Sequence, residues 1–217
     1  MENIKEWLEL IYFASGPVVV VIAYLALSQI KIAKEQVLEQ KKALLIASKR
    51  DSLTLTSDQV KLYFEQVIPL QNTLDEKLKT EEIDLLNKFE VEFGENSVNI
   101  IHSEKKVEFP EFEKFISEFV NVANAMESFS TYFTSGVADE KVAYLSLGVT
   151  FCDSMKKISP ILILVHNEER HFTAVLRLYY IWGVRIEAEK LNKEREKIER
   201  KLELSTQMSV KVVGIDS

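Results

Sequence analysis

Three side chains close together in the sequence could bind a metal ion: His166, Glu169 and His171. On a helix, Glu169 would lie about one turn after His166 and share its face, whereas His171 would point elsewhere. A zinc site needs three or four converging ligands, and the chain has no second half to this motif. We therefore predict no metal site and no cofactor. A hydrolase that uses these three residues stays an alternative hypothesis.

Nucleophilic side chains are present but lack the partners that would activate them. Cys152, the only cysteine, lies beside Asp153 without a histidine at a fixed spacing, and it can form no intramolecular disulfide. No nucleophile-elbow pattern surrounds the hydroxyl groups near one predicted helix end, which belong to Ser128, Ser130, Thr131 and Ser135. The glycine-rich loops that bind nucleotide phosphates are also missing from the sequence. We predict that this chain is not an enzyme.

The strongest signal is an uncharged stretch of twenty-one positions, residues 10–30. As a helix it would measure about 31 Å, which is close to the thickness of the hydrocarbon core of a bilayer. A buried core helix is usually shorter, and a cleaved signal peptide would need a basic start and a small-residue cleavage site. We therefore predict one membrane span, marked by Leu10, Gly16, Pro17, Val20, Leu25 and Ile30.

Basic residues that follow the span predict its orientation. The nearest of these cations are Lys31, Lys34, Lys41 and Lys42. Lysine and arginine near the end of a span stay preferentially on the cytoplasmic side. We therefore expect a single-pass protein of the bacterial inner membrane, with its N-terminus outside and its C-terminal domain in the cytoplasm. The same lysines would bind anionic lipid headgroups.

The pair Gly16-Pro17 interrupts the span and allows two arrangements. Proline lacks a backbone donor and crowds the preceding turn, so the span could be one kinked helix that begins near Leu8. Alternatively, a short interfacial helix ends near Ser15, and Pro17 opens the span. The sequence does not decide between them.

Composition predicts an all-helical protein. Hydrophobic residues make up 47% of the 217 positions, which is enough for a packed core, and only 6 glycines and 4 prolines are present to break helices. The net charge of −7 is divided into +2 for residues 1–50 and −9 for the remainder. A nucleic-acid surface would need clustered lysine and arginine, so the acidic remainder argues against that partner.

We expect four parts along the chain. Residues 1–30 form an N-terminal tail and transmembrane helix, and residues 31–52 form a basic juxtamembrane helix with a short coiled-coil-like repeat. Residues 53–186 form an antiparallel helical bundle in the cytoplasm. Residues 187–217 form a charged helix end, in which twelve of the seventeen residues from 187 to 203 are charged, followed by a flexible tail from Ser205 onward.

The helix boundaries of the bundle follow from caps and breaks. Lys49-Arg50-Asp51-Ser52 is either a break or a polar patch, and Pro69 should bend or interrupt a helix at 53–79. Thr80 should open a shorter helix at 81–92, because Glu81 and Glu82 would lie in its first turn. Residues 93–109 are irregular, with a possible extended piece at 98–101. Further helices are expected at 139–165 and from about 167 onward.

An apolar stripe predicts the core of this bundle. Large apolar residues after Phe109-Pro110 alternate in steps of three and four, which is the spacing of one buried helix face. They are Phe112, Phe115, Phe119, Val122, Met126, Phe129 and Phe133. Tyr179 and Trp182 should lie on the core face of the last helix. An aromatic ligand pocket is the alternative reading of the stripe.

Several segments resemble a group of uncharacterised bacterial proteins known by a domain-of-unknown-function label. The similar segments are 12–17, 23–27, 68–70, 132–140 and 148–152, with the sequences YFASGP, AYLAL, IPL, YFTSGVADE and GVTFC. The resemblance covers most of residues 8–186. It implies one N-terminal span and a helical cytoplasmic part, and it brings no known activity or catalytic residues.

Two functions fit these features. The first is a membrane-tethered, non-enzymatic module for protein interaction, scaffolding or signalling, with the lipid bilayer and either a protein partner or a second copy as its contacts. The alternative is a membrane-perturbing effector of stress response or phage defence, because a span interrupted at Gly16-Pro17 can pack in several ways.

Overall fold

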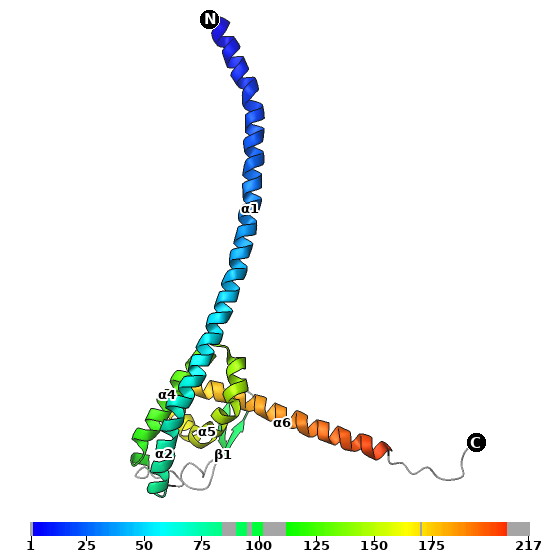
Figure 1. Cartoon of the computed structure of the whole chain (residues 1–217). Helices are drawn as coiled ribbons and strands as arrows, with labels where there is room; N and C mark the ends of the chain where they lie inside the picture. The colour runs from blue at the N-terminus through cyan, green and yellow to red at the C-terminus, as the bar shows by residue number, and fades with distance from the viewer. Residues whose placement is uncertain (1, 84–89, 95–96, 102–111, 170, 208–217) are drawn as a thin grey trace, which may run out of the picture. The chain divides into compact units, whose positions relative to one another are not determined.

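Helices dominate this chain (Figure 1). The computed structural model describes residues 2–83, 90–94, 97–101, 112–169 and 171–207. The described elements, in chain order, are α1 (Glu2–Leu62), the π-helical turn η1 (Tyr63–Val67), α2 (Ile68–Thr80), β1 (Glu90–Phe93), β2 (Val98–Ile101), α4 (Ile116–Thr134), α5 (Glu140–Glu169) and α6 (Thr173–Gln207). The predicted all-α class is confirmed, with one small two-stranded sheet added.

The chain divides into two units, Met1–Asp51 and Ser52–Ser217. The first unit consists of the N-terminal part of α1, and every described side chain in it is exposed. α1 continues through Pro17 and through residues 49–52. The expected alternative of a separate interfacial helix ending near Ser15 is therefore wrong. Proline removes one backbone hydrogen bond and crowds the preceding turn, but the helix continues on both sides of Pro17.

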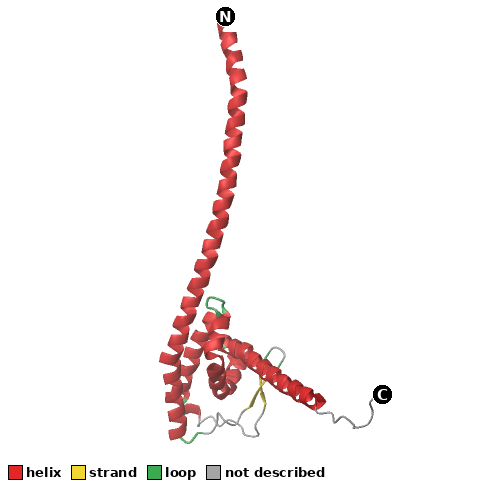
Figure 2. Ribbon diagram, turned by 45° about the vertical axis from the view of Figure 1, so that its right-hand side comes forward, coloured by secondary structure: helices red, strands yellow, loops and turns green. Residues whose placement is uncertain are grey.

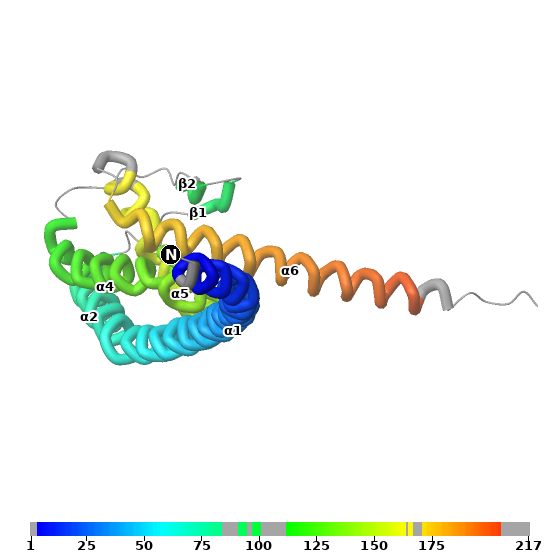
Figure 3. Tube along the Cα trace, turned by 90° about the horizontal axis from the view of Figure 1, so that it is seen from above, coloured from blue at the N-terminus to red at the C-terminus, as the bar shows by residue number. Residues whose placement is uncertain are grey.

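The second unit has one hydrophobic core. α4 packs against α2, α5 and α6, and α5 also packs against α6 (Figure 3). The two strands lie against α5, and β1 also contacts α6 (Figure 2). The structure buries most of the predicted stripe, namely Phe115, Phe119, Val122, Met126, Phe129 and Phe133, and leaves Phe112 half-buried. Tyr179 and Trp182 are also buried, and the Trp182 ring centroid lies 5.0 Å from that of Phe151.

Pro69 does not end its helix, because the turn before it widens. The backbone N–H of Ile68 donates to the carbonyl of Tyr63, five residues earlier, which is the π-helical pattern. Pro69 then occupies the first turn of α2, where a missing N–H costs little. The widened turn thus accommodates the proline and keeps both Tyr63 and Val67 in the core.

The helix expected at 81–92 is wrong wherever the structure describes it. Thr80 does not cap a helix: its hydroxyl donates to the carbonyl of Glu76, four residues earlier in α2. The chain leaves α2 at Glu82, which has a left-handed φ of 55°. Residues 90–93 then pair antiparallel with 98–101, so the extended piece expected at 98–101 is confirmed. Residues 84–89 lie outside the described part.

Alternation of polar and apolar side chains explains β1. Val91 and Phe93 pack against the core, whereas Glu92 is exposed. The Phe93 ring lies 5.1 Å from the Tyr179 ring, centroid to centroid, and a Cβ atom at Gly183 would overlap it. Glycine at 183 is therefore required for the close approach of the strand to α6.

The last helix begins later than expected. Residues 167–169 belong to the last turn of α5, and α6 starts at Thr173. The chain reverses at Phe172, which has a φ of 62°. An asparagine followed by two glutamates is typical of a helix start, but here these residues continue the helix that the preceding aliphatic residues of α5 form. α6 extends to Gln207, so the expected start of the tail at Ser205 is wrong, and residues 208–217 lie outside the described part.

Candidate functional site

The apolar part of α1 is the most extensive candidate site. Large hydrophobic side chains are more than half exposed along it, and Tyr12 reaches 78%. More than half of each side chain is also exposed at the predicted span residues Leu10, Val20, Leu25 and Ile30. Exposed apolar surface of this extent marks a contact with lipid or protein. Within the described residues, one helix is long and apolar enough to cross a membrane.

The lysines that follow this segment are solvent-exposed. Lys42 Nζ lies 2.8 Å from Glu39 Oε1, a surface pair that contributes little stability. Elsewhere in this described stretch, Lys31, Lys34 and Lys41 form no ion pair. Their charges are therefore available to anionic groups outside the chain.

The histidine cluster of the sequence does not come together as a metal site. His166 Nδ1 lies 2.6 Å from the carbonyl oxygen of His171. A carbonyl only accepts, so Nδ1 carries the hydrogen and Nε2 is the nitrogen left for any ligand. Over the ranges that the structure describes, no group of three histidine, cysteine or acidic side chains could hold a metal ion.

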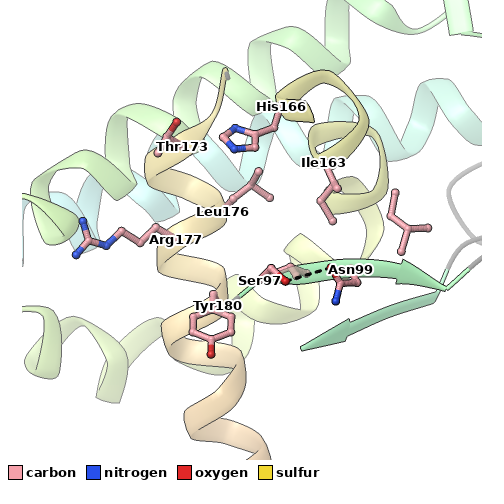
Figure 4. Close-up of a pocket in the computed structure, with 10 residues that line it drawn as sticks. Ser97, Asn99, Ile163, His166, Thr173, Leu176, Arg177 and Tyr180 are labelled. Atoms are coloured by element: carbon pink, nitrogen blue, oxygen red, sulfur yellow. Dashed lines mark hydrogen bonds between the residues drawn. The ribbon is translucent and has the colours of Figure 1, made fainter. Parts of the chain in front are cut away.

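His166 instead lines a pocket of about 600 Å³ between α5, α6 and β2 (Figure 4). α6 contributes one face, with residues spaced by three and four, and β2 with its preceding turn contributes four residues. The full lining is Ser97, Val98, Asn99, Ile100, Ile163, His166, Thr173, Leu176, Arg177 and Tyr180. The volume is typical of small-molecule pockets. Arg177 leaves α6 at the rim and points away from His166 (Figure 4).

The cysteine, serine and threonine side chains considered as nucleophiles have no activating base among the contacts that the structure describes for them. Cys152 is only 3% exposed, and burial raises the pKa of its thiol to about 12, so the thiol stays protonated at neutral pH. The hydroxyls of Ser130 and Thr131 donate to backbone carbonyls four residues earlier in α4. The Ser135 hydroxyl donates to the carbonyl of Tyr132. These contacts are local helix hydrogen bonds.

A charged and aromatic cluster joins α5 to α6, and sequence reasoning missed it. Arg185 forms a two-armed ion pair with Glu140, with N···O distances of 2.9 and 3.2 Å, and its guanidinium lies 4.4 Å from the centre of the Tyr144 ring. Trp182 Nε1 also donates to Glu140. The Tyr144 hydroxyl donates to Glu189 Oε1 at 2.7 Å.

The surroundings of Tyr144 in this cluster raise the pKa of its hydroxyl. Partial burial, together with the hydrogen bond and negative charge of Glu189, raises the pKa of Tyr144 to about 12. The spacing of the residues along each helix was a usable signal, because Glu140 and Tyr144 are four apart, as are Arg185 and Glu189.

A second missed feature is a partly buried polar network at the edge of the core. Ser154 Oγ donates to Gln71 Oε1 at 2.9 Å, and the Tyr63 hydroxyl lies 3.5 Å from both Ser154 Oγ and Gln71 Nε2. Burial raises the pKa of Tyr63, so its hydroxyl stays protonated. The network links η1, α2 and α5 and contains no activated nucleophile.

Glu127 of α4 caps the start of α6. Its two carboxylate oxygens accept hydrogen bonds from the backbone N–H groups of Ala174 and Val175, at 3.0 and 2.8 Å. A negative charge at a helix N-terminus also interacts favourably with the helix dipole. This capping residue lies 47 positions before Ala174, so no local sequence pattern reveals it.

Comparison with known proteins gives no match to a protein family, a curated protein or a solved structure. The described geometry therefore stands alone, and its most extensive feature is the exposed apolar segment of α1.

Proposed function

We propose that this chain is a single-pass protein of the bacterial inner membrane whose cytoplasmic domain, an antiparallel helical bundle, serves as a non-enzymatic interaction, scaffold or signalling module. The observation that carries the proposal is the exposed apolar segment of α1. Burial of such side chains in lipid is favourable by about 25 cal/mol per Å². We also propose that the chain belongs to the uncharacterised bacterial family that its sequence resembles.

The distribution of charge supports the proposed orientation. Exposed lysines follow the span, whereas Lys5 is the only cationic side chain among residues 1–9, which precede it. The acidic second unit has its own core and would remain in the cytoplasm. With the N-terminus outside, the basic segment would lie against the anionic inner leaflet.

Alkaline carbonate extraction of native membranes tests the anchor. The unaltered chain should stay in the membrane pellet, whereas Val20→Asp combined with Leu25→Asp should move it to the soluble fraction. A matched control is Leu191→Asp with Ile198→Asp, two exposed apolar sites on α6, which should not change the partition. Release of the unaltered chain by carbonate would refute the anchor. A C-terminal phosphatase fusion that is active in the periplasm would reverse the orientation.

The interaction role needs a separate test. Amine-reactive crosslinking in native membranes, followed by mass spectrometry, should yield products larger than the single chain. Recovery of uncrosslinked chain only would contradict this role.

A membrane-perturbing effector is the second candidate, and the position of Pro17 inside α1 favours it. A proline in a span weakens one turn, so the span can adopt more than one arrangement. Induction of the unaltered chain should then depolarise cells that carry a potential-sensitive dye, and Pro17→Ala should reduce that effect. An intact membrane potential at full expression would remove this candidate.

A further inference from the structure

The part of α1 beyond the span keeps an apolar face that lipid does not explain. Val37 is 64% exposed and Leu44 is 70% exposed, although both lie more than one helical turn past Ile30. All side chains of this part of α1, up to residue 51, are exposed. Because aliphatic groups in water favour association, we expect this face to contact a partner.

One apolar face of this segment follows a heptad register, whereas Leu38, Leu45 and Ile46 are also exposed and lie outside it. Ile30, Val37 and Leu44 are seven residues apart, and Ala33, Gln40 and Ala47 follow each of them by three. These spacings are the a and d positions of a coiled coil. The same register extends back into the span, where Gly16 and Ala23 occupy a positions. Small side chains there allow two helices to approach closely within lipid.

Charges along this segment are placed to leave the face uncharged. Glu35, Glu39 and Lys42 lie on the opposite side of the helix in this register, and Glu39 pairs there with Lys42 at 2.8 Å. Gln29 and Gln36 flank the face on one side at g positions, and Lys34 and Lys41 flank it on the other at e positions. The face is therefore neutral, with neutral groups on one flank and cations on the other.

The flanks fit a second, parallel copy of the same helix. In a parallel pair each g residue faces the e residue five positions later on the other helix, which places Gln29 opposite Lys34 and Gln36 opposite Lys41. An antiparallel pair would instead bring lysine flanks together. Two copies anchored in one membrane with the same orientation present their helices in parallel. A glutamine carbonyl can accept a hydrogen bond from the facing lysine.

We propose that α1 pairs with α1 of a second copy in parallel, through the seam defined by Ile30, Ala33, Val37, Gln40, Leu44 and Ala47. The proposal rests on the membrane anchoring proposed above, because anchoring sets the parallel orientation. Gln40 is the one polar member of the seam. A polar residue at a core position favours a single register at some cost in stability.

Disulfide crosslinking in native membranes tests the seam with single added cysteines. The natural Cys152 is buried, so the unaltered chain is a silent background. Val37→Cys and Leu44→Cys place thiols on the seam, and Glu35→Cys and Lys42→Cys are matched controls on the opposite side of the same helix. Because a disulfide needs Cα atoms within about 7 Å, mild oxidation should give roughly tenfold more dimer at the seam positions than at the controls.

Each result has a defined meaning. Equal dimer yields at positions 35 and 37, or monomer only at all four positions, would overturn the seam. A crosslinked product whose mass exceeds the chain by something other than a second copy would overturn the self-pairing and point to another protein. Retention of the same variants after carbonate extraction shows that the anchor stands when the seam fails, and their release shows that the anchor itself has failed.

Discussion

Substitution of Glu127 tests whether a residue of α4 holds the start of α6. Its carboxylate accepts two backbone hydrogen bonds, from Ala174 at 3.0 Å and Val175 at 2.8 Å. Hydrogen bonds to a charged group contribute about 1.5–3 kcal/mol each when buried. The site is only partly buried, and water can replace part of this interaction, so the sum must be reduced.

We expect Glu127→Ala to lower the free energy of unfolding by about 2–3 kcal/mol, because two helix donors lose their acceptors and the helix dipole loses its facing charge. Glu127→Gln keeps one acceptor oxygen but no charge, and should cost about 1 kcal/mol. Asn124→Ala, an exposed site on the same helix, is the control and should change the free energy by less than about 0.5 kcal/mol.

Fluorescence of Trp182 provides the assay, because this side chain is fully buried in the second unit. Trp7 is the only other tryptophan, so Trp7→Phe leaves a single reporter in the full-length chain. Urea titration in detergent then gives the unfolding midpoint of each variant. A midpoint for Glu127→Ala equal to that of Asn124→Ala would refute the capping role.

Three further predictions concern the second unit. Phe119→Ala should lower the free energy of unfolding by roughly 3–5 kcal/mol in the same urea assay, and an unchanged midpoint would show that this side chain is not packed as described. Arg185→Lys should lower the free energy of unfolding by about 1 kcal/mol, because lysine can form neither the two-armed pair with Glu140 nor the stacking on Tyr144. The loss is small because the site is partly exposed. A midpoint within error of that of the unaltered chain would contradict this. Glu189→Gln should lower the pKa of Tyr144 from about 12 toward 10 in an ultraviolet titration, although burial, the larger cause, should keep it above 10. Because the pKa of Tyr144 is higher in the folded than in the unfolded chain, its contribution to stability is complete below about pH 10 and is lost as the pH rises toward 12. The Glu189→Gln variant should lose less stability over that pH range. A Tyr144 titration that the substitution leaves unaltered would contradict the role of Glu189.

The sequence predicted those features that depend on local periodicity. The three-four spacing from Phe112 to Phe133 indicated a buried helix face, and most of those side chains are in the core. The uncharged stretch at 10–30 likewise indicated a long apolar helix. Both signals repeat over many residues, so no single exception changes the result.

Boundaries and distant contacts were less predictable. A threonine followed by two glutamates indicated a helix start at Thr80, yet its hydroxyl bonds backwards into α2 and the following residues turn. The strand at Glu90–Phe93 is stabilised by its hairpin pairing with Val98–Ile101 and by contacts with α5 and α6, and these helix contacts are distant in the sequence. The capping of α6 by Glu127 is of the same kind, because the two partners meet only after folding.

The widened turn at Tyr63–Val67 affects how distant homologues of this chain should be aligned with it. A π-helical turn holds one more residue than the α-helical turn that it replaces. A homologue without that residue would keep α-helical hydrogen bonding there, and its apolar positions on the two sides would be one residue closer together. Alignments that allow a single-position gap between residues 62 and 68 should therefore join the two halves of the helix correctly, whereas ungapped ones would set Leu74 and Leu78 against polar positions.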